Sequence, residues 1–283
     1  MTEESSAASV APWQSPTLSL DGRVAIVAGA GQTPGPVIGN GRAACVLFAR
    51  AGAHVVALDR DRASAEETAA MIEAEGGSAE ALVADVTEEA GLVTVVEAIV
   101  ERHGRIDVLQ NNVGVAYTGG DSPLADLDEA SFDRVMAINL RGTVMACKHV
   151  VPVMRSQGSG VITNISSIAA VVDYKSVTYK TSKAGMIAFS RQLALDCAPD
   201  GVRVNAILPG YMDTPMAVDT QARRYGKPRE EIAATRDTWS PLKGGMGSAW
   251  DVAQASLFLA SDAARFITGV ALPVDGGVMA RIG

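Results

Sequence analysis

The sequence is poor in cysteine and histidine. Among 283 residues there are three cysteines, Cys45, Cys147 and Cys197, and they form no CxxC pair. Disulfide-rich domains carry an even and denser set, so we expect free thiols and a cytoplasmic location. The three histidines show no HExxH or similar spacing, which predicts no metal centre.

Positive charge and long apolar runs are also scarce. The formal net charge is −8, whereas nucleic-acid-binding proteins usually present a basic face, so we expect no nucleic-acid partner. No apolar run reaches the roughly 18 residues of a membrane span, so we expect no membrane partner. Residues 1–19 lack the basic start and apolar run of a signal peptide. They predict a flexible N-terminal arm before a domain over 20–283.

The sequence does contain strand-like and helix-like segments in alternation. Short β-branched runs occur at 23–28, 54–58, 81–84, 106–109, 160–165, 202–208 and 270–274. Helical patterns lie between them, at 42–51, 63–75, 87–102, 131–156, 178–198 and 249–260. This order predicts the α/β class, as a single doubly wound Rossmann-type domain with a seven-stranded parallel sheet and helices on both faces. Ligands of such a sheet bind at the carboxyl ends of its strands.

A glycine-rich loop follows the first predicted strand. Gly29 and Gly31 come directly after the strand, and Gly39 and Gly41 open the next helix. Glycine lets the backbone approach a pyrophosphate, to which the helix N-terminus offers free N–H groups. The loop therefore predicts a dinucleotide site.

Asp59 ends the second predicted strand. A carboxylate there accepts hydrogen bonds from both ribose hydroxyls and repels a 2′-phosphate, which favours NAD over NADP. Arg60 and Arg62 follow Asp59 and soften that preference.

The ends of the later strands carry an ordered set of motifs. They are Asp85-Val86, Asn111-Asn112-Val113-Gly114, Asn139, Asn164-Ile165-Ser166-Ser167, Tyr179-Lys180-Thr181-Ser182-Lys183, Pro209-Gly210 with Thr214-Pro215, and Val274-Asp275-Gly276-Gly277. In this order they resemble the short-chain dehydrogenase/reductase family, in its branch with a YxxxK active site, over residues 20–277. The resemblance implies an oxidoreductase that transfers a hydride between NAD(H) and a secondary alcohol or ketone.

Tyr179 and Lys183 are four residues apart, which places both side chains on one face of a helix. A nearby ammonium favours the phenolate, so we expect Lys183 to lower the pKa of Tyr179. Tyr179 then acts as the general acid/base on the substrate oxygen.

The resemblance implies further roles. One family serine binds the substrate oxygen: matching from the strand favours Ser167, whereas the usual spacing of thirteen residues to the tyrosine fits Ser166. Asn139 matches an asparagine that holds a water on the proton path to the lysine. The cofactor residues implied beyond the glycine loop and Asp59 are Asp85, Val86, Asn112, Tyr179, Lys183, Met212 and Thr214.

The glycine loop departs from the family pattern. Nine residues separate Gly29 from Gly39, about six more than usual, and residues 32–37 carry the excess. Gly35, Gly39 and Gly41 also have the family spacing by themselves, so Gly35 is an alternative to Gly29 as the first glycine of the motif. The position directly after the strand favours Gly29. We expect the added residues to cover part of the pyrophosphate. A longer loop is typical of enoyl reductases, which are the alternative function. Counted from Tyr179, the spacing between tyrosine and lysine in those enzymes would require a lysine at the position of Met186.

The variable segments of the family predict a substrate wall of Tyr117, Tyr174 and Tyr211, and a lid over about 213–247. The cations of this lid are interpreted as a solvated helix face, with an anionic substrate as the alternative: Arg223, Arg224, Lys227, Arg229 and Arg236.

Two more functions compete with the dehydrogenase. A non-catalytic NAD-binding regulator is disfavoured by the intact Asn139, Ser167, Tyr179 and Lys183, and a lyase or dehalogenase is disfavoured by Asp59 and the glycine loop. Family members are commonly tetramers built on two long helices, here 131–156 and 178–198. The resemblance thus implies a homo-oligomer, a tetramer or dimer.

Overall fold

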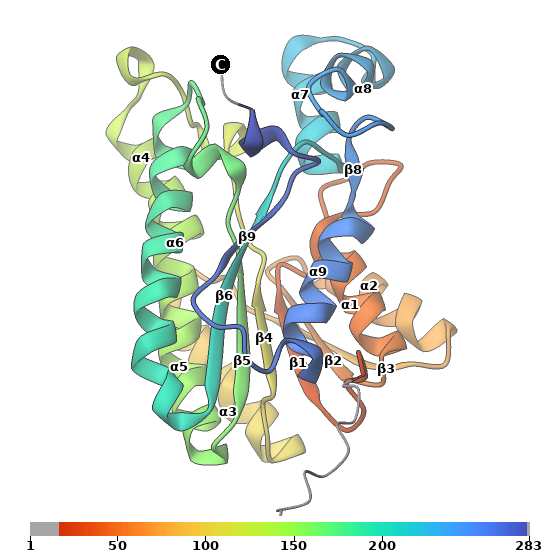
Figure 1. Cartoon of the computed structure of the whole chain (residues 1–283), viewed down its shortest axis with the longest axis vertical. Helices are drawn as coiled ribbons and strands as arrows, with labels where there is room; N and C mark the ends of the chain where they lie inside the picture. Colours follow the sequence, from red (N-terminus) through yellow and green to blue (C-terminus); the bar gives the residue numbers. More distant parts are fainter. Residues whose placement is uncertain (1–16, 282–283) are drawn as a thin grey trace, which may run out of the picture.

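A computed structural model describes residues 17–281 (Figure 1). The predicted arm over 1–19 therefore lies almost entirely outside the described residues. Seven parallel strands form one sheet in the order β3-β2-β1-β4-β5-β6-β9. Their bounds are β1 Val24–Ala28, β2 His54–Asp59, β3 Ser78–Val83, β4 Val108–Asn111, β5 Gly160–Ile165, β6 Val202–Pro209 and β9 Ala271–Val274. The predicted fold class is confirmed.

Helices cover both faces of the sheet (Figure 1). One layer holds α1 (Asn40–Arg50), α2 (Arg62–Ala74) and α9 (Ala249–Ala260), and the other holds α3 (Glu89–His103), α4 (Glu129–Met136), α5 (Gly142–Gln157) and α6 (Val177–Cys197). The region of the predicted lid contains α7 (Thr220–Tyr225) and α8 (Arg229–Asp237), with β7 (Met212–Asp213) and β8 (Gly247–Ser248) paired at its base.

The alternation of side chains along β1 explains the two layers. Val24 and Ile26 pack into the core under α3, α5 and α6, while Ala25 and Val27 pack into the core under α1 and α9. A strand buried on both faces needs apolar residues at every position, which is why these strands read as continuous apolar runs.

The strand order reverses between β1 and β4, because β1 continues outward through β2 and β4 continues outward through β5. The loops after β1 and β4 therefore diverge and leave a crevice at the carboxyl ends of the strands. The site predicted from sequence lies at this point.

The largest differences from the predicted element bounds occur in two places. β3 begins at Ser78, three residues early, because an exposed edge strand tolerates Ser78 and Glu80. The helix predicted over 131–156 is divided by a π-helical turn, Ala137–Arg141, that contains Asn139. Within 17–281, no helix is both long enough and apolar enough to cross a membrane.

Candidate active site

A cavity of about 570 Å³ lies at the carboxyl ends of the strands. Its size suits a small-molecule or cofactor site. It is lined by almost every residue predicted for the site: Gly29, Gly31, Gly39, Gly41, Asp59, Asp85, Val86, Asn112, Tyr117, Ser166, Ser167, Tyr174, Tyr179, Lys183, Tyr211, Met212 and Thr214. We call the part of the cavity formed by 29–41, 59–64, 85–86 and Asn112 the glycine-loop side. We call the part formed by Tyr117, Tyr174 and 211–247 the lid side.

Backbone segments approach each other closely on the glycine-loop side. A Cβ on Gly41 would lie 1.9 Å from the carbonyl oxygen of Gly29, and one on Gly29, whose φ is +82°, would lie 2.9 Å from the Val113 nitrogen. Asn112 Nδ2 donates to that same Gly29 carbonyl at 3.0 Å. Only glycine fits where the turn after β1, the start of α1 and the end of β4 meet. Gly29 stands at this meeting point, whereas Gly35 faces Pro215 and Asp219.

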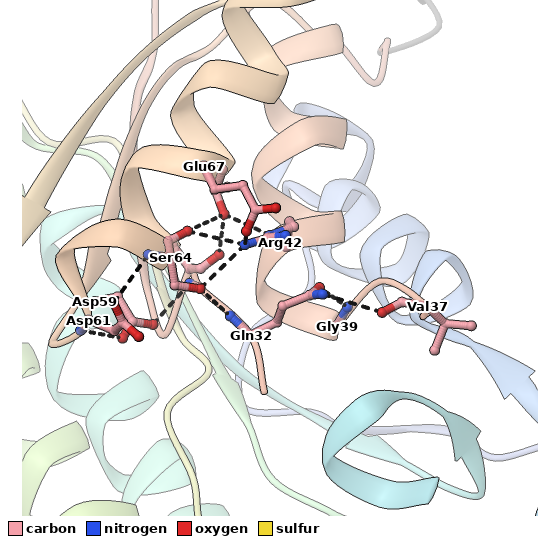
Figure 2. Close-up of polar contacts among 11 residues, drawn as sticks. Gln32, Val37, Gly39, Arg42, Asp59, Asp61, Ser64 and Glu67 are labelled. Atoms are coloured by element: carbon pink, nitrogen blue, oxygen red, sulfur yellow. Dashed lines mark hydrogen bonds and ion pairs between the residues drawn. The ribbon is translucent and has the colours of Figure 1, made fainter. Parts of the chain in front are cut away.

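The added residues of the loop are closed by Gln32 (Figure 2). Its Oε1 accepts the Gly39 N–H at 2.9 Å, and its Nε2 donates to the Val37 carbonyl at 3.4 Å. Its own backbone N–H donates to Ser64 Oγ at 3.0 Å, which ties the loop to α2. The loop is thus held in a defined shape, with Gln32, Thr33 and Pro34 on the cavity wall.

Asp59 binds the loop from the end of β2 (Figure 2). Its Oδ2 accepts the Gly31 N–H at 2.9 Å, and its Oδ1 accepts the Asp61 N–H at 3.0 Å. Each carboxylate oxygen has a second lone pair, so Asp59 keeps acceptor capacity toward the cavity. Arg42 on α1 pairs with Glu67 on α2 at 2.6 Å and holds the two helices together behind it.

Asp85 lies beside this wall, after β3. Burial opposes its ionisation, but hydrogen bonds from the backbone and hydroxyl of Thr87 outweigh burial and lower the pKa of the Asp85 carboxyl. The carboxylate is therefore a fixed anionic acceptor next to the cavity.

Tyr179, Ser167 and Lys183 meet at the centre of the cavity. The side chain of Ser167 lies close enough to that of Tyr179 to lower its pKa. Lys183 Nζ lies 5.7 Å from the Tyr179 ring centroid and donates to the Ile165 carbonyl at 2.7 Å. Tyr179 and Lys183 come from α6, and Ser167 follows β5, so one strand–helix unit builds the centre.

The pKa values at this centre correct one expectation. Burial raises the pKa of Tyr179, and the neighbouring Ser167 side chain offsets only part of that rise. Burial also lowers the pKa of Lys183 to about 7, which reduces its charge near neutral pH. In the protein alone, desolvation therefore outweighs the predicted effect of the ammonium on Tyr179.

The two candidate serines have different surroundings. Ser166 Oγ is buried and donates to the Lys183 carbonyl at 2.8 Å, which fixes α6 against β5. Ser167 Oγ instead lies close enough to Tyr179 to lower its pKa, and it accepts the Ala169 N–H at 3.1 Å. The geometry thus supports Ser167 as the serine beside the tyrosine.

Asn139 does not line the cavity. Its fully buried side chain accepts the Val115 N–H at 2.8 Å and donates to the Val115 carbonyl at 2.9 Å and to Ser182 Oγ at 3.0 Å. These contacts join the loop after β4 to α6, one residue before Lys183. Its role in holding a water stays a prediction.

Asp121 was missed in the sequence. Its carboxylate accepts the backbone N–H groups of Thr178 at 3.0 Å and Tyr179 at 3.1 Å, and so caps the first turn of α6. The cap comes from 57 residues upstream, so no local capping pattern could have revealed it.

The lid side is aromatic, as predicted, and carries two arginines. The ring centroids of Tyr174 and Tyr179 lie 5.6 Å apart, and those of Tyr211 and Trp239 lie 5.0 Å apart in a tilted arrangement. The guanidinium of Arg224 lies 4.2 Å from the centre of the Tyr117 ring, and that of Arg236 lies 5.3 Å from the Tyr211 ring.

The solvated-face interpretation of the lid cations is wrong for Arg236. That residue is only 6% exposed and lines the cavity. The remaining cations fit the interpretation better: Lys227 pairs with Glu231, Arg229 pairs with Asp213 and Asp219, and Arg223 and Arg224 are exposed.

Two histidines that are far apart in sequence meet at the opposite end of the sheet. His103 Nε2 lies 2.7 Å and His54 Nε2 lies 3.5 Å from Glu80 Oε1, and Arg102 also binds Glu80. Spacing along the chain could not reveal this cluster. That the chain holds no metal centre stays a prediction.

The glycine-loop side fits a dinucleotide. The first turn of α1, which includes Asn40 and Gly41, opens onto the cavity, and such a turn has backbone N–H groups without intrahelical partners. The Asn40 side-chain oxygen is buried there without a hydrogen-bond partner among the described residues. Free N–H groups suit a pyrophosphate, and Asp59 and Asp85 supply acceptors for ribose and adenine.

Comparisons with known proteins agree with this geometry. A family model described as Enoyl-(Acyl carrier protein) reductase matches residues 37–279. The chain is 37% identical to 2-(R)-hydroxypropyl-CoM dehydrogenase of Xanthobacter autotrophicus, over 91% of this chain and 99% of the relative. A short-chain dehydrogenase/reductase structure from Burkholderia xenovorans is 43% identical, with a TM-score of 0.84 over 93% of this chain and 99% of that one. Carveol dehydrogenase from Mycobacterium avium, in complex with NAD, is 29% identical, with a TM-score of 0.84 over 93% and 99%.

Proposed function

The chain belongs to the short-chain dehydrogenase/reductase family, and from this premise we propose that it transfers a hydride between NAD(H) and a secondary alcohol or ketone. The observation that carries the proposal is the meeting of Tyr179, Ser167 and Lys183 in a cavity that also contains the glycine loop and Asp59. The bound nicotinamide supplies the hydride chemistry.

In this proposal, Tyr179 moves the proton. During alcohol oxidation its phenolate takes the hydroxyl proton, and during ketone reduction its hydroxyl donates a proton to the carbonyl oxygen. Ser167 donates a hydrogen bond to the same oxygen and stabilises the negative charge that develops on it. Burial and the charge of Asp121 raise the pKa of Tyr179. Protonated Lys183 and a positively charged nicotinamide would favour the phenolate.

NAD rather than NADP is the proposed cofactor. The free acceptor capacity of Asp59 toward the cavity suits two ribose hydroxyls, and its charge opposes a 2′-phosphate. The known NAD complex of carveol dehydrogenase agrees with this choice. The residues that would hold the cofactor are the four loop glycines, Asp59, Asp85, Val86, Asn112, Met212 and Thr214, and the wall of Gln32, Thr33 and Pro34 would cover the pyrophosphate.

Ketone and alcohol chemistry suits the centre better than enoyl reduction. Met186 stands at the position where the enoyl reductase spacing requires a lysine, and it is fully buried in the core. Lys183 lies instead beside the Tyr179 ring.

A screen of secondary alcohols with NAD, repeated with NADP, tests the proposal. We expect reduction of NAD at a higher kcat/KM than NADP. Tyr179→Phe should lower turnover at least a hundredfold and leave NADH affinity, measured by fluorescence titration, nearly unchanged. Unchanged turnover in this variant would refute the mechanism, and failure to bind either nucleotide would refute the dehydrogenase itself.

The remaining proposals concern location and assembly. Cys45, Cys147 and Cys197 are free and buried, which supports a reducing cytoplasm. We propose a tetramer or dimer that uses the outer faces of α5 and α6, where Leu195 is largely exposed. Light scattering of the purified protein measures the assembly.

A further inference from the structure

Arg236 is a buried cation without a carboxylate partner. Within residues 17–281 its side chain makes one hydrogen bond, from Nε to Met246 Sδ at 3.3 Å, and forms no ion pair. The nearby Asp213 is bound by Arg229. A buried guanidinium is costly unless it meets an anion, because it loses its hydration.

The surroundings of Arg236 leave the cavity as the place for that anion. Tyr211 contributes its ring face, at 5.3 Å from the guanidinium carbon. Tyr117 and Tyr174 are also close enough to this guanidinium to affect it electrostatically, and neither residue type is a carboxylate. Among the acidic residues of the cavity wall, Asp59, Asp61 and Asp85 lie on the glycine-loop side, and Asp173 is exposed to solvent.

Arg236 also lies on the substrate's side of Tyr179. Tyr174 connects the two: its ring packs 5.6 Å from the Tyr179 ring, and its side chain is close enough to Arg236 to affect it electrostatically. A molecule whose carbonyl meets Tyr179 and that extends past Tyr174 would reach the guanidinium.

We propose that Arg236 binds a carboxylate of the substrate, so that the enzyme acts on hydroxy acids and keto acids. The proposal rests on the dehydrogenase function proposed above. A carboxylate matches the planar fork of a guanidinium, forms charge-assisted hydrogen bonds with it, and compensates its buried charge. Neutral ketones of the same shape leave that charge uncompensated.

The test separates anion binding from turnover. The enzyme–NADH complex is titrated with cyclohexanecarboxylate and with cyclohexanecarboxamide, which cannot be reduced, and binding is measured by calorimetry. We expect the carboxylate to bind about ten- to a hundredfold more tightly. Arg236→Met should abolish this preference and Arg236→Lys should retain part of it, whereas Lys227→Met, which removes an exposed lid cation, should keep it.

Kinetics with paired substrates give the second measurement. NADH oxidation is followed with levulinate, oxocyclohexanecarboxylate and their methyl esters. Arg236→Met should raise KM for the acids at least ten times more than it raises KM for the esters. Equal affinity for carboxylate and carboxamide in the wild type, or a preference that persists in Arg236→Met, would overturn the proposal. Loss of turnover with all ketones would count against the dehydrogenase function. The titration would still test whether Arg236 binds a carboxylate. Thermal unfolding and NADH affinity establish that each variant is folded, and Arg236→Gln replaces the Met variant if that one is not.

Discussion

The two sides of the cavity are built from different kinds of contact. The glycine-loop side depends on close backbone approach, as between Gly41 and Gly29, and on side chains such as Gln32 and Asp59 that accept backbone N–H groups. The lid side depends on contacts between side chains, such as Tyr211 on Trp239 and Arg236 near Tyr211. Backbone contacts restrict which residues fit, whereas side-chain contacts can be exchanged. One side can thus stay constant while the other adapts to a substrate.

Gly41→Ala should have the largest effect if backbone approach fixes the glycine-loop side. The new Cβ would lie 1.9 Å from a backbone oxygen, so we expect the free energy of unfolding to fall by about 3 kcal/mol. NADH binding should be lost. Gly91→Ala is the control, because its Cβ would meet only Ala84, at 3.5 Å in the first turn of α3. Equal effects of the two substitutions in urea unfolding would contradict the close-approach account.

Lys183→Met tests the centre of the cavity, which lies between the glycine-loop side and the lid side. Burial lowers the pKa of Lys183 to about 7 in the folded protein, whereas the unfolded chain keeps this proton up to about pH 10. Between these values the unfolded state binds more protons, so the stability of the wild type rises with pH. Relative to Lys183→Met, the wild type should gain about 2 kcal/mol from about pH 7 to pH 9. Urea unfolding across this range measures the difference, and a constant difference would contradict the assignment.

Asp121→Asn should have a smaller effect, on the first turn of α6. The neutral side chain caps less well, so we expect a loss of about 1.5 kcal/mol. Because the Asp121 charge contributes to the raised pKa of Tyr179, its removal should also shift the basic limb of the pH–rate profile of ketone reduction, in which Tyr179 must be protonated, to lower pH. Asp128→Asn, at the cap of α4, serves as the control: it should cost similar stability without shifting the profile. A profile that moves equally in both variants would count against the positioning role of Asp121.

Gln32→Ala should have the smallest effect of the four. Loss of its two side-chain hydrogen bonds within the loop should reduce stability by about 1 kcal/mol. NADH affinity should fall a few-fold, because the loop is no longer held in one shape. Gln254→Ala, at an exposed position of α9, is the control for fluorescence titration. Unchanged NADH affinity in Gln32→Ala would show that the added residues do not contribute to the cofactor site.

The sequence predicted the glycine-loop side better than the lid side. Gly29, Gly41 and Asp59 occupy fixed places relative to strand ends, and strand order brings them together. Arg236 and Asp121 have no such signal, because their partners come from distant segments whose approach depends on the fold. The predicted pKa shift of Tyr179 was wrong for the protein alone, since burial cannot be read from a four-residue spacing.

The hydrogen bonds of Gln32 explain how a chain can lengthen a loop inside a binding site. One side chain joins both ends of the added segment, from Gln32 to Val37 and Gly39. Outside the loop, the segment uses Ser64 Oγ for the Gln32 N–H and Arg223 for the Pro34 carbonyl. An insertion closed in this way needs few partners from its neighbours, so evolution can add or remove it by changes at few positions.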